Sequence, residues 1–138
     1  MQVEPAPTPA IAKAVAEIER QLRPAAVLLF GSEATGRANA LSDVDLAVLL
    51  DRHATTPILT IRTVASDVEA IVGRPVDLVV LNAASPVIAM QVLRGGRLLS
   101  CASAECLEEF TVRTLTDYAD LKIVRRPIEE RLLRTEGT

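Results

Sequence analysis

The sequence contains few aromatic residues, one histidine and two cysteines. It has no tryptophan, one tyrosine and two phenylalanines among 138 residues, too few to form an aromatic surface on which single-stranded nucleic acid could stack. Cys101 and Cys106 have neither the spacing of a zinc knuckle nor that of a disulfide framework, so we expect both to be reduced. His53 is the sole histidine, and without a Gly-x-Ser-x-Gly elbow it does not indicate a Ser-His-Asp hydrolase.

The sequence also lacks a long hydrophobic run and an excess of positive charge. No segment approaches the roughly 18 uncharged apolar residues of a transmembrane helix, and the first residues do not resemble a signal peptide. We therefore expect a cytoplasmic protein without membrane contact. Fifteen basic and eighteen acidic residues give a net charge of −3, so direct nucleic-acid binding is not expected.

The chain is long enough and apolar enough to form one domain with its own core. Hydrophobic residues make up 49% of its 138 residues, which is sufficient for a core without disulfides or a structural metal. We expect a flexible N-terminus over residues 1–8 and a core over residues 9–101. Residues 102–138 are expected to form a helical extension of the same domain.

Three pairs of a hydroxyl residue and a proline indicate where helices begin: Thr8-Pro9, Thr56-Pro57 and Ser85-Pro86. In each pair the hydroxyl can cap the helix, and proline at the first helical position loses no hydrogen bond. A further helix is expected over about residues 103–124, and Pro127 should end or kink it. Apolar runs at residues 25–30, 44–50 and 76–81, with a short piece at 97–99, predict strands covered by helices on both faces.

Two aspartates lie at the start of the second predicted strand. Side chains alternate between the two faces of a strand, so Asp43 and Asp45 project to the same side while Val44 projects to the other. Two neighbouring carboxylates repel each other unless a cation lies between them. Because no histidine is nearby and all the ligands are oxygens, the pattern favours Mg²⁺, or Mn²⁺, over zinc.

A third aspartate and a glycine-serine turn complete the candidate site. Asp77 interrupts the apolar run of the third strand, where a charge is unfavourable unless it is paired or binds a metal. If the two strands are neighbours, Asp77 is a third metal ligand or the base that accepts a proton from an attacking hydroxyl. Gly31-Ser32 follows the first strand, and such a turn lets backbone N–H groups and a hydroxyl approach a phosphate.

These residues resemble the signature of a known family. Gly31-Ser32, ten intervening residues and Asp43-Val44-Asp45 are similar to the motif of the minimal nucleotidyltransferase (MNT) family in the DNA polymerase β superfamily. The resemblance extends over roughly residues 10–100 and includes Asp77. It implies an α+β (α/β-like) nucleotidyltransferase fold, in which helices cover a small mixed β-sheet and a C-terminal helix follows.

The resemblance also implies roles for individual residues. Asp43, Asp45 and Asp77 would be the catalytic residues and the ligands of Mg²⁺ or Mn²⁺. Nucleotide-binding residues would be Gly31, Ser32, Arg37 and Ser42, with ATP as the substrate. Family members often carry basic residues directly after the glycine-serine pair, whereas this chain has Glu33 and Thr35 there, so Arg37 is the nearest basic residue.

The implied reaction is attack of a hydroxyl on the α-phosphate of a nucleoside triphosphate. The MNT family resembles the antitoxin of a bacterial pair, which transfers AMP to a tyrosine of a HEPN ribonuclease toxin and silences it. About forty residues follow the predicted core, too few for a second pocket, so we expect a protein acceptor of this HEPN type. Two alternatives remain open: an antitoxin that acts by contact alone, and a nucleotidyltransferase for an antibiotic or another small molecule. Assembly with a second copy or with another protein is equally open.

Overall fold

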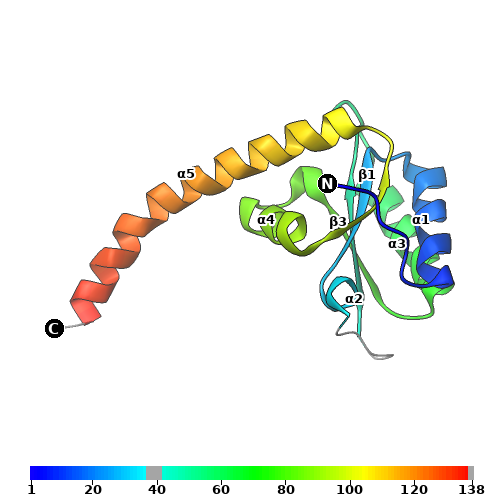
Figure 1. Cartoon of the computed structure of the whole chain (residues 1–138), viewed down its shortest axis with the longest axis horizontal. Coiled ribbons are helices and arrows are strands. Elements are labelled where there is room, and N and C mark those ends of the chain that lie inside the picture. The colour runs from blue at the N-terminus through cyan, green and yellow to red at the C-terminus, as the bar shows by residue number, and fades with distance from the viewer. Residues whose placement is uncertain (37–41, 137–138) are drawn as a thin grey trace.

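Four short apolar segments pair into a single mixed sheet (Figure 1). The computed structural model describes the backbone of residues 1–36 and 42–136, with side chains up to residue 122. The strands are β1 (Ala26–Phe30), β2 (Val44–Leu49), β3 (Val76–Val80) and β4 (Arg97–Cys101), in the order β3-β2-β1-β4. β1 is antiparallel to β2 and to β4, whereas β2 and β3 are parallel. The four predicted strands are confirmed, with ends that differ by one or two residues.

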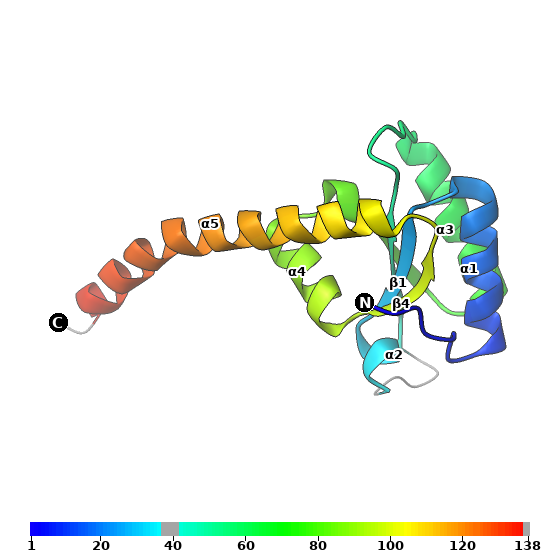
Figure 2. The same cartoon turned by 45° about the horizontal axis from the view of Figure 1, so that its top comes forward.

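Helices cover both faces of this sheet, which confirms the α+β fold expected from the sequence (Figure 2). On one face lie α1 (Pro9–Leu22) and α3 (Ile58–Val72); on the other lie α4 (Pro86–Gly95) and the start of α5 (Ala104–Glu136). A four-residue helix, α2 (Ser32–Thr35), follows β1, and a 3₁₀ turn, η1 (Leu81–Ala83), follows β3. None of the helices that the structure describes is long and apolar enough to cross a membrane.

Strand β2 contributes to both cores because its side chains alternate between the two faces. Val44, Leu46 and Val48 are fully buried among residues of α1 and α3. Ala47 and Leu49 are buried on the opposite face, with residues of α4 and α5. By the same alternation Asp45 lies on the α4–α5 face. It is near the start of β2, where the core on that face stops.

Two of the three expected helix caps are present. The Thr8 hydroxyl accepts a hydrogen bond from Ile11 N at 3.2 Å, and the Ser85 hydroxyl accepts one from Ile88 N at 3.3 Å. The prediction for Thr56 was wrong, because Pro57 is extended at φ −60° and ψ 145° and α3 begins one residue later. Pro57 is therefore the N-cap residue of α3; it has no side-chain cap, and its carbonyl accepts the first bond of the helix, from Ile61 N at 3.3 Å.

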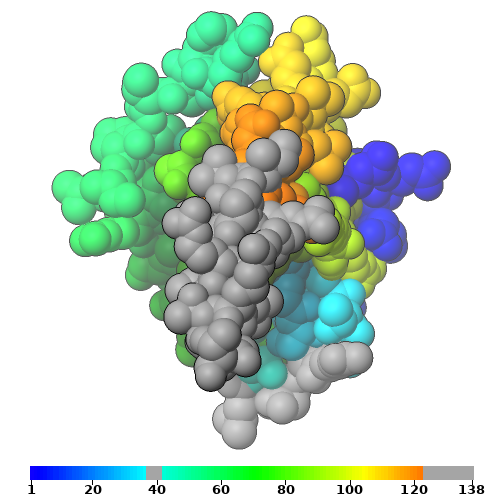
Figure 3. Space-filling view, turned by 90° about the vertical axis from the view of Figure 1, so that its left-hand side faces the viewer, coloured from blue at the N-terminus to red at the C-terminus, as the bar shows by residue number. Residues whose placement is uncertain are grey.

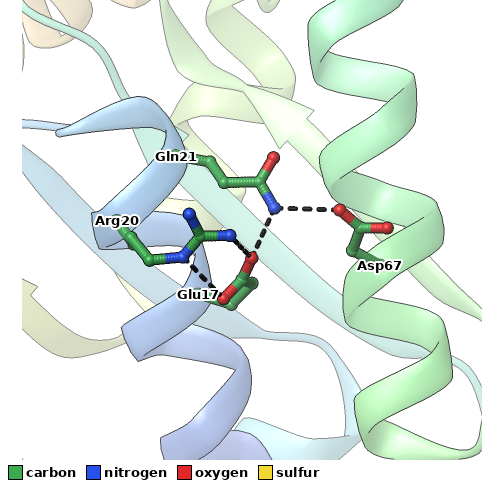
Figure 4. A network of polar contacts seen from close by, with 4 residues as sticks. All are labelled: Glu17, Arg20, Gln21 and Asp67. Carbon is green, nitrogen blue, oxygen red and sulfur yellow. Dashed lines mark hydrogen bonds and ion pairs between the residues drawn. The ribbon is translucent and has the colours of Figure 1, made fainter.

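A polar network joins α1 to α3 on the outer surface of their face (Figure 4). The side-chain amide of Gln21 donates to Glu17 Oε1 at 2.5 Å on its own helix and to Asp67 Oδ2 at 2.9 Å on α3. Glu17 also forms an ion pair with Arg20. The two helices therefore contact each other through a polar bridge as well as through their apolar sides.

Helix α5 does not end at Pro127, the residue that we expected to end or kink it. The helix continues to Glu136 and arches away from the sheet (Figure 1). A proline inside a helix removes one backbone hydrogen bond and clashes with the preceding turn, which a long helix accommodates by bending. The start of α5 is anchored by Leu107 and Phe110, which are buried against the α4 side of the sheet.

The N-terminal segment, which we expected to be flexible, runs along the edge strand β4. Val3 forms a parallel bridge with Leu98, and Glu4 N donates to the Leu98 carbonyl at 2.7 Å. Arg97 Nε lies 3.5 Å from Glu4 Oε1, and its guanidinium donates to the Pro5 carbonyl at 3.3 Å. These contacts cover part of the exposed edge of the sheet.

Candidate active site

The antiparallel pairing of β1 and β2 brings the glycine-serine turn beside the first aspartates. Phe30, the last residue of β1, is opposite Asp45 near the start of β2. Gly31 and Ser32 continue directly from Phe30, so the turn into α2 lies next to Asp45 although fourteen positions separate Gly31 from it. The pairing of β1 with β2 thus brings together Gly31-Ser32 and Asp43-Val44-Asp45, the two parts of the motif that ten residues separate in the sequence.

Asp45 lies against the backbone of Gly31. A Cβ placed on Gly31 would overlap the Asp45 Oδ2 atom and would lie 3.2 Å from its Cγ. Gly31 also adopts φ 72° and ψ −152°, a conformation that is essentially restricted to glycine. Only glycine therefore fits here, and the half-buried Asp45 carboxylate is directed at the turn, as the sequence motif required.

Asp77 is the immediate neighbour of Asp45 on the adjacent strand. β2 and β3 pair in parallel with Asp45 opposite Asp77, so both side chains project from the same face of the sheet. Asp43 lies two residues before Asp45, just outside the strand, and both Asp43 and Asp77 are exposed. The structure therefore brings the three predicted carboxylates to one corner of the sheet.

The three carboxylates also interact electrostatically. Burial, followed by the negative charges of Asp77 and Asp43, raises the pKa of Asp45 above its ordinary value of 3.8. A shift of this kind means that the ionised form of Asp45 is disfavoured by the protein alone. A cation bound between these groups would remove that penalty.

The three carboxylates suit a divalent cation whose remaining ligands come from a bound nucleotide and from water. Among the described residues, no three acidic, histidine or cysteine side chains form a ready-made metal-binding group. Mg²⁺ in nucleotide sites is commonly held by one or two carboxylates, with waters and substrate phosphates as the remaining ligands. The paired Asp45 and Asp77, with Asp43 beside them, have the oxygen ligands and the excess negative charge that such an ion needs.

Of the other predicted nucleotide-binding residues, the structure describes Ser32 and Ser42 but not Arg37. Ser32 is half-buried at the start of α2, and Ser42 is half-buried directly before Asp43. Arg37 lies outside the described residues. Viewed from the side toward which α5 projects, α2 is exposed near the lower edge of the molecule, below the start of α5 (Figure 3).

One residue near the site was missed by the sequence analysis. Arg74 forms an ion pair with Glu33 of α2. The two residues are 41 positions apart, so no local pattern indicated the contact. An acidic residue in a turn expected to bind phosphate was the one signal that could have suggested a nearby basic partner.

A mixed sheet that places a glycine-serine turn against clustered aspartates defines a nucleotidyltransferase. The model of the family described as "Polymerase beta, Nucleotidyltransferase" matches residues 13–105. The chain is also 32% identical over 108 residues to the protein adenylyltransferase MntA of Aphanizomenon flos-aquae (strain 2012/KM1/D3), an alignment that covers 72% of each protein.

Solved structures show the same relationship. A crystal structure of a toxin-antitoxin with AMP-PNP has a TM-score of 0.74 at 28% identity, covering 88% of this chain and 97% of that one. A tri-AMPylated Shewanella oneidensis HEPN toxin in complex with MNT antitoxin has a TM-score of 0.73 at 26% identity, covering 90% and 96%. The chain belongs to the polymerase β nucleotidyltransferase family, in its minimal (MNT) antitoxin branch, and the resemblance seen in the sequence is confirmed.

Proposed function

We propose that this chain is a protein adenylyltransferase that transfers AMP from ATP to a hydroxyl of a HEPN-type toxin and thereby acts as its antitoxin. The observation that carries the proposal is the Asp45 carboxylate, packed on Gly31 and paired in register with Asp77. The similar proteins support the choice of substrate, because they include an adenylyltransferase, a complex with AMP-PNP and an AMPylated HEPN toxin.

In this proposal the triphosphate lies along the Gly31-Ser32 turn. The Ser32 hydroxyl, at the start of α2, donates to the phosphate oxygens. Ser42 and Arg37 contribute further donors from the segment that leads into β2. The turn and the carboxylates, which lie side by side, then bind the same triphosphate.

Asp43, Asp45 and Asp77 would hold the divalent cations, Mg²⁺ or Mn²⁺. When bound, such ions neutralise the triphosphate and stabilise the charge on the leaving pyrophosphate. Asp45 contributes the most buried of the three carboxylates, and its raised pKa reflects an arrangement suited to a positively charged ligand.

The transfer itself needs only one proton acceptor from the protein. The acceptor hydroxyl oxygen, on a tyrosine of the toxin, forms a bond to the α-phosphorus. The bond from that phosphorus to the oxygen bridging the α- and β-phosphates breaks, and pyrophosphate leaves with the electron pair. Asp77, exposed at the edge of the site, receives the hydroxyl proton.

The test is a transfer assay with the HEPN protein encoded beside this gene. ATP labelled at the α-phosphate should label the HEPN protein in the presence of Mg²⁺, whereas ATP labelled at the γ-phosphate should not. The variant with Asp43→Asn and Asp45→Asn should transfer no label, and Glu109→Gln, in an exposed ion pair on α5, should behave as the wild type. Absence of α-label on the HEPN protein would exclude the proposed activity.

One observation favours the second candidate, neutralisation by contact alone. On α5, Val112 and Leu115 lie three positions apart and are 64% and 52% exposed, so they offer neighbouring apolar side chains to a partner. The Asp43→Asn, Asp45→Asn variant separates the two candidates. If it still binds the toxin but no longer neutralises it, transfer is required; if neutralisation persists, contact is sufficient.

A further inference from the structure

Helix α2 is too short to hold its own position. It has four residues, none of them buried, and its N-cap Gly31 provides no side-chain hydrogen bond. Its internal bonds are few: Thr35 N donates to the Gly31 carbonyl at 3.3 Å, and the Thr35 hydroxyl, at 3.2 Å, and Gly36 N donate to the Ser32 carbonyl. A single helical turn is not stable in isolation, so contacts with the rest of the protein must fix the glycine-serine turn.

One of these contacts is an ion pair between Glu33 and Arg74, which joins α2 to the loop before β3. The side chain of Glu33 is 9% exposed and that of Arg74 is 23% exposed, which makes this the most buried of the ion pairs in the described residues. Exposed pairs contribute little, because water and salt screen them. The pair of Glu33 and Arg74 is largely shielded from water, so it is screened less than the exposed pairs are.

Arg74 belongs to a loop that is itself rigidly held. Gly73 ends α3 in a left-handed conformation at φ 75°. The Pro75 carbonyl accepts a hydrogen bond from Val44 N, at the start of β2, at 2.9 Å. Val76 N donates to Glu69 Oε1 at 3.0 Å. The loop therefore has fixed contacts to the strand that carries Asp45 and leads directly into the strand that carries Asp77.

We infer that Glu33 and Arg74 are a positioning pair, which holds the Gly31-Ser32 turn in place beside Asp45 and Asp77 so that the turn and the carboxylates can bind one triphosphate. The inference rests on the proposed function, since it assigns the turn to nucleotide binding. It also accounts for an acidic residue in a turn that binds phosphate. The Glu33 carboxylate forms its ion pair with Arg74, which compensates its negative charge. Both residues line a pocket together with Thr8 and Ile11, at the start of α1.

The experiment compares nucleotide binding and turnover in variants of this pair. Glu33→Gln and Arg74→Gln are each expected to raise KM for ATP, and the Kd for ATP with Mg²⁺, by roughly tenfold to a hundredfold. The kcat at saturating ATP should change much less, because neither side chain is assigned to the reacting groups. The reversed pair, Glu33→Arg with Arg74→Glu, should recover most of the lost affinity.

Two further variants control for the loss of any ion pair and for a variant that does not fold. Glu109→Gln breaks the exposed pair with Arg52, in which the side chains are 48% and 66% exposed, and should leave KM unchanged. Arg74→Lys keeps the charge on a more flexible side chain and should give an intermediate KM. It tests the pair even if Arg74→Gln does not fold. A folded Glu33→Gln protein with the KM and Kd of the wild type, even with a lowered melting temperature, would overturn the inference.

The design also separates this inference from the proposed function. If the wild type binds ATP but transfers no AMP to the HEPN protein, the proposed function fails, and the Kd values still test the pair. If the wild type transfers AMP and the variants match it in KM and Kd, the pair fails and the function stands. A wild type that does not bind ATP at all would contradict both.

Discussion

The Asp45 carboxylate lies against the backbone of Gly31, where the chain turns from β1 into α2. This contact joins the two halves of the sequence motif: the side that binds phosphate and the side that binds the cation. It depends on the absence of a side chain at position 31, so a single methyl group there tests whether the contact matters.

We expect Gly31→Ala to abolish AMP transfer, because the new Cβ would displace the Asp45 carboxylate. The backbone conformation of Gly31 should add a loss of about 1–3 kcal/mol in the free energy of unfolding. Gly36→Ala is the matched control: Gly36 also has a positive φ, 74°, but no atom of the residues that the structure describes would lie within 4 Å of its Cβ. That control should lose about 1 kcal/mol of stability and retain transfer. Equal activity in the two variants would show that the contact between Gly31 and Asp45 is not needed.

The raised pKa of Asp45 should appear as a pH dependence of stability in the absence of divalent ions. Between the ordinary value of 3.8 and the raised value, the folded state binds more protons at Asp45 than the unfolded state does. The wild type therefore loses stability as the pH rises through that window, and the loss is complete above it. Asp45→Asn lacks this titration.

Denaturant unfolding of both proteins with EDTA, at a series of pH values from below 4 to 7, measures this effect. The stability of Asp45→Asn relative to the wild type should increase with pH through the window and then level off. A difference that stays constant or falls with rising pH would mean that Asp45 is not desolvated and repelled as the structure indicates.

Asp77→Asn should separate proton transfer from cation binding. If Asp77 accepts the hydroxyl proton, kcat for AMP transfer falls by about 10²-fold or more and KM for ATP changes little. The measurement is steady-state transfer to the HEPN protein at several ATP concentrations. A large rise in KM with an unchanged kcat would instead assign Asp77 to holding the cation and the nucleotide.

The two hydroxyl-proline pairs at α1 and α3 should respond differently to mutation. Thr8→Ala removes a hydrogen bond to Ile11 N and should reduce the free energy of unfolding by about 1 kcal/mol. Thr56→Ala should have little effect, because the cap of α3 is Pro57. Thermal or urea unfolding of the two variants measures the difference. Equal losses would restore Thr56 as the cap.

Local patterns in the sequence predicted most of the fold. Most of β2 is apolar on both faces because helices cover both. Its continuous run of apolar residues therefore predicted the strand to within one residue. The hydroxyl-proline pairs located α1 and α4 because the caps at Thr8 and Ser85 depend only on residues three positions away. The Asp43-Val44-Asp45 spacing likewise predicted two carboxylates on one side, since alternation along a strand is local.

The remaining features depend on contacts between distant segments. The register that places Asp77 beside Asp45 comes from the parallel pairing of β2 with β3, which α3 connects, and from the sequence it could be stated only as a condition. The Glu33–Arg74 pair and the pairing of Val3 with Leu98 join segments far apart in the chain. At Pro127 a local rule left two outcomes, an end or a kink, and the helix continues to Glu136.

The most direct test of the central claim is a crystal structure with a non-hydrolysable ATP analogue and Mn²⁺, whose anomalous scattering locates the ion without ambiguity. We expect the Mn²⁺ signal at the carboxylates of Asp43 and Asp45, with the triphosphate between the ion and the Gly31-Ser32 turn. An anomalous signal elsewhere, or a nucleotide bound away from Ser32, would contradict the assignment of this corner of the sheet as the active site.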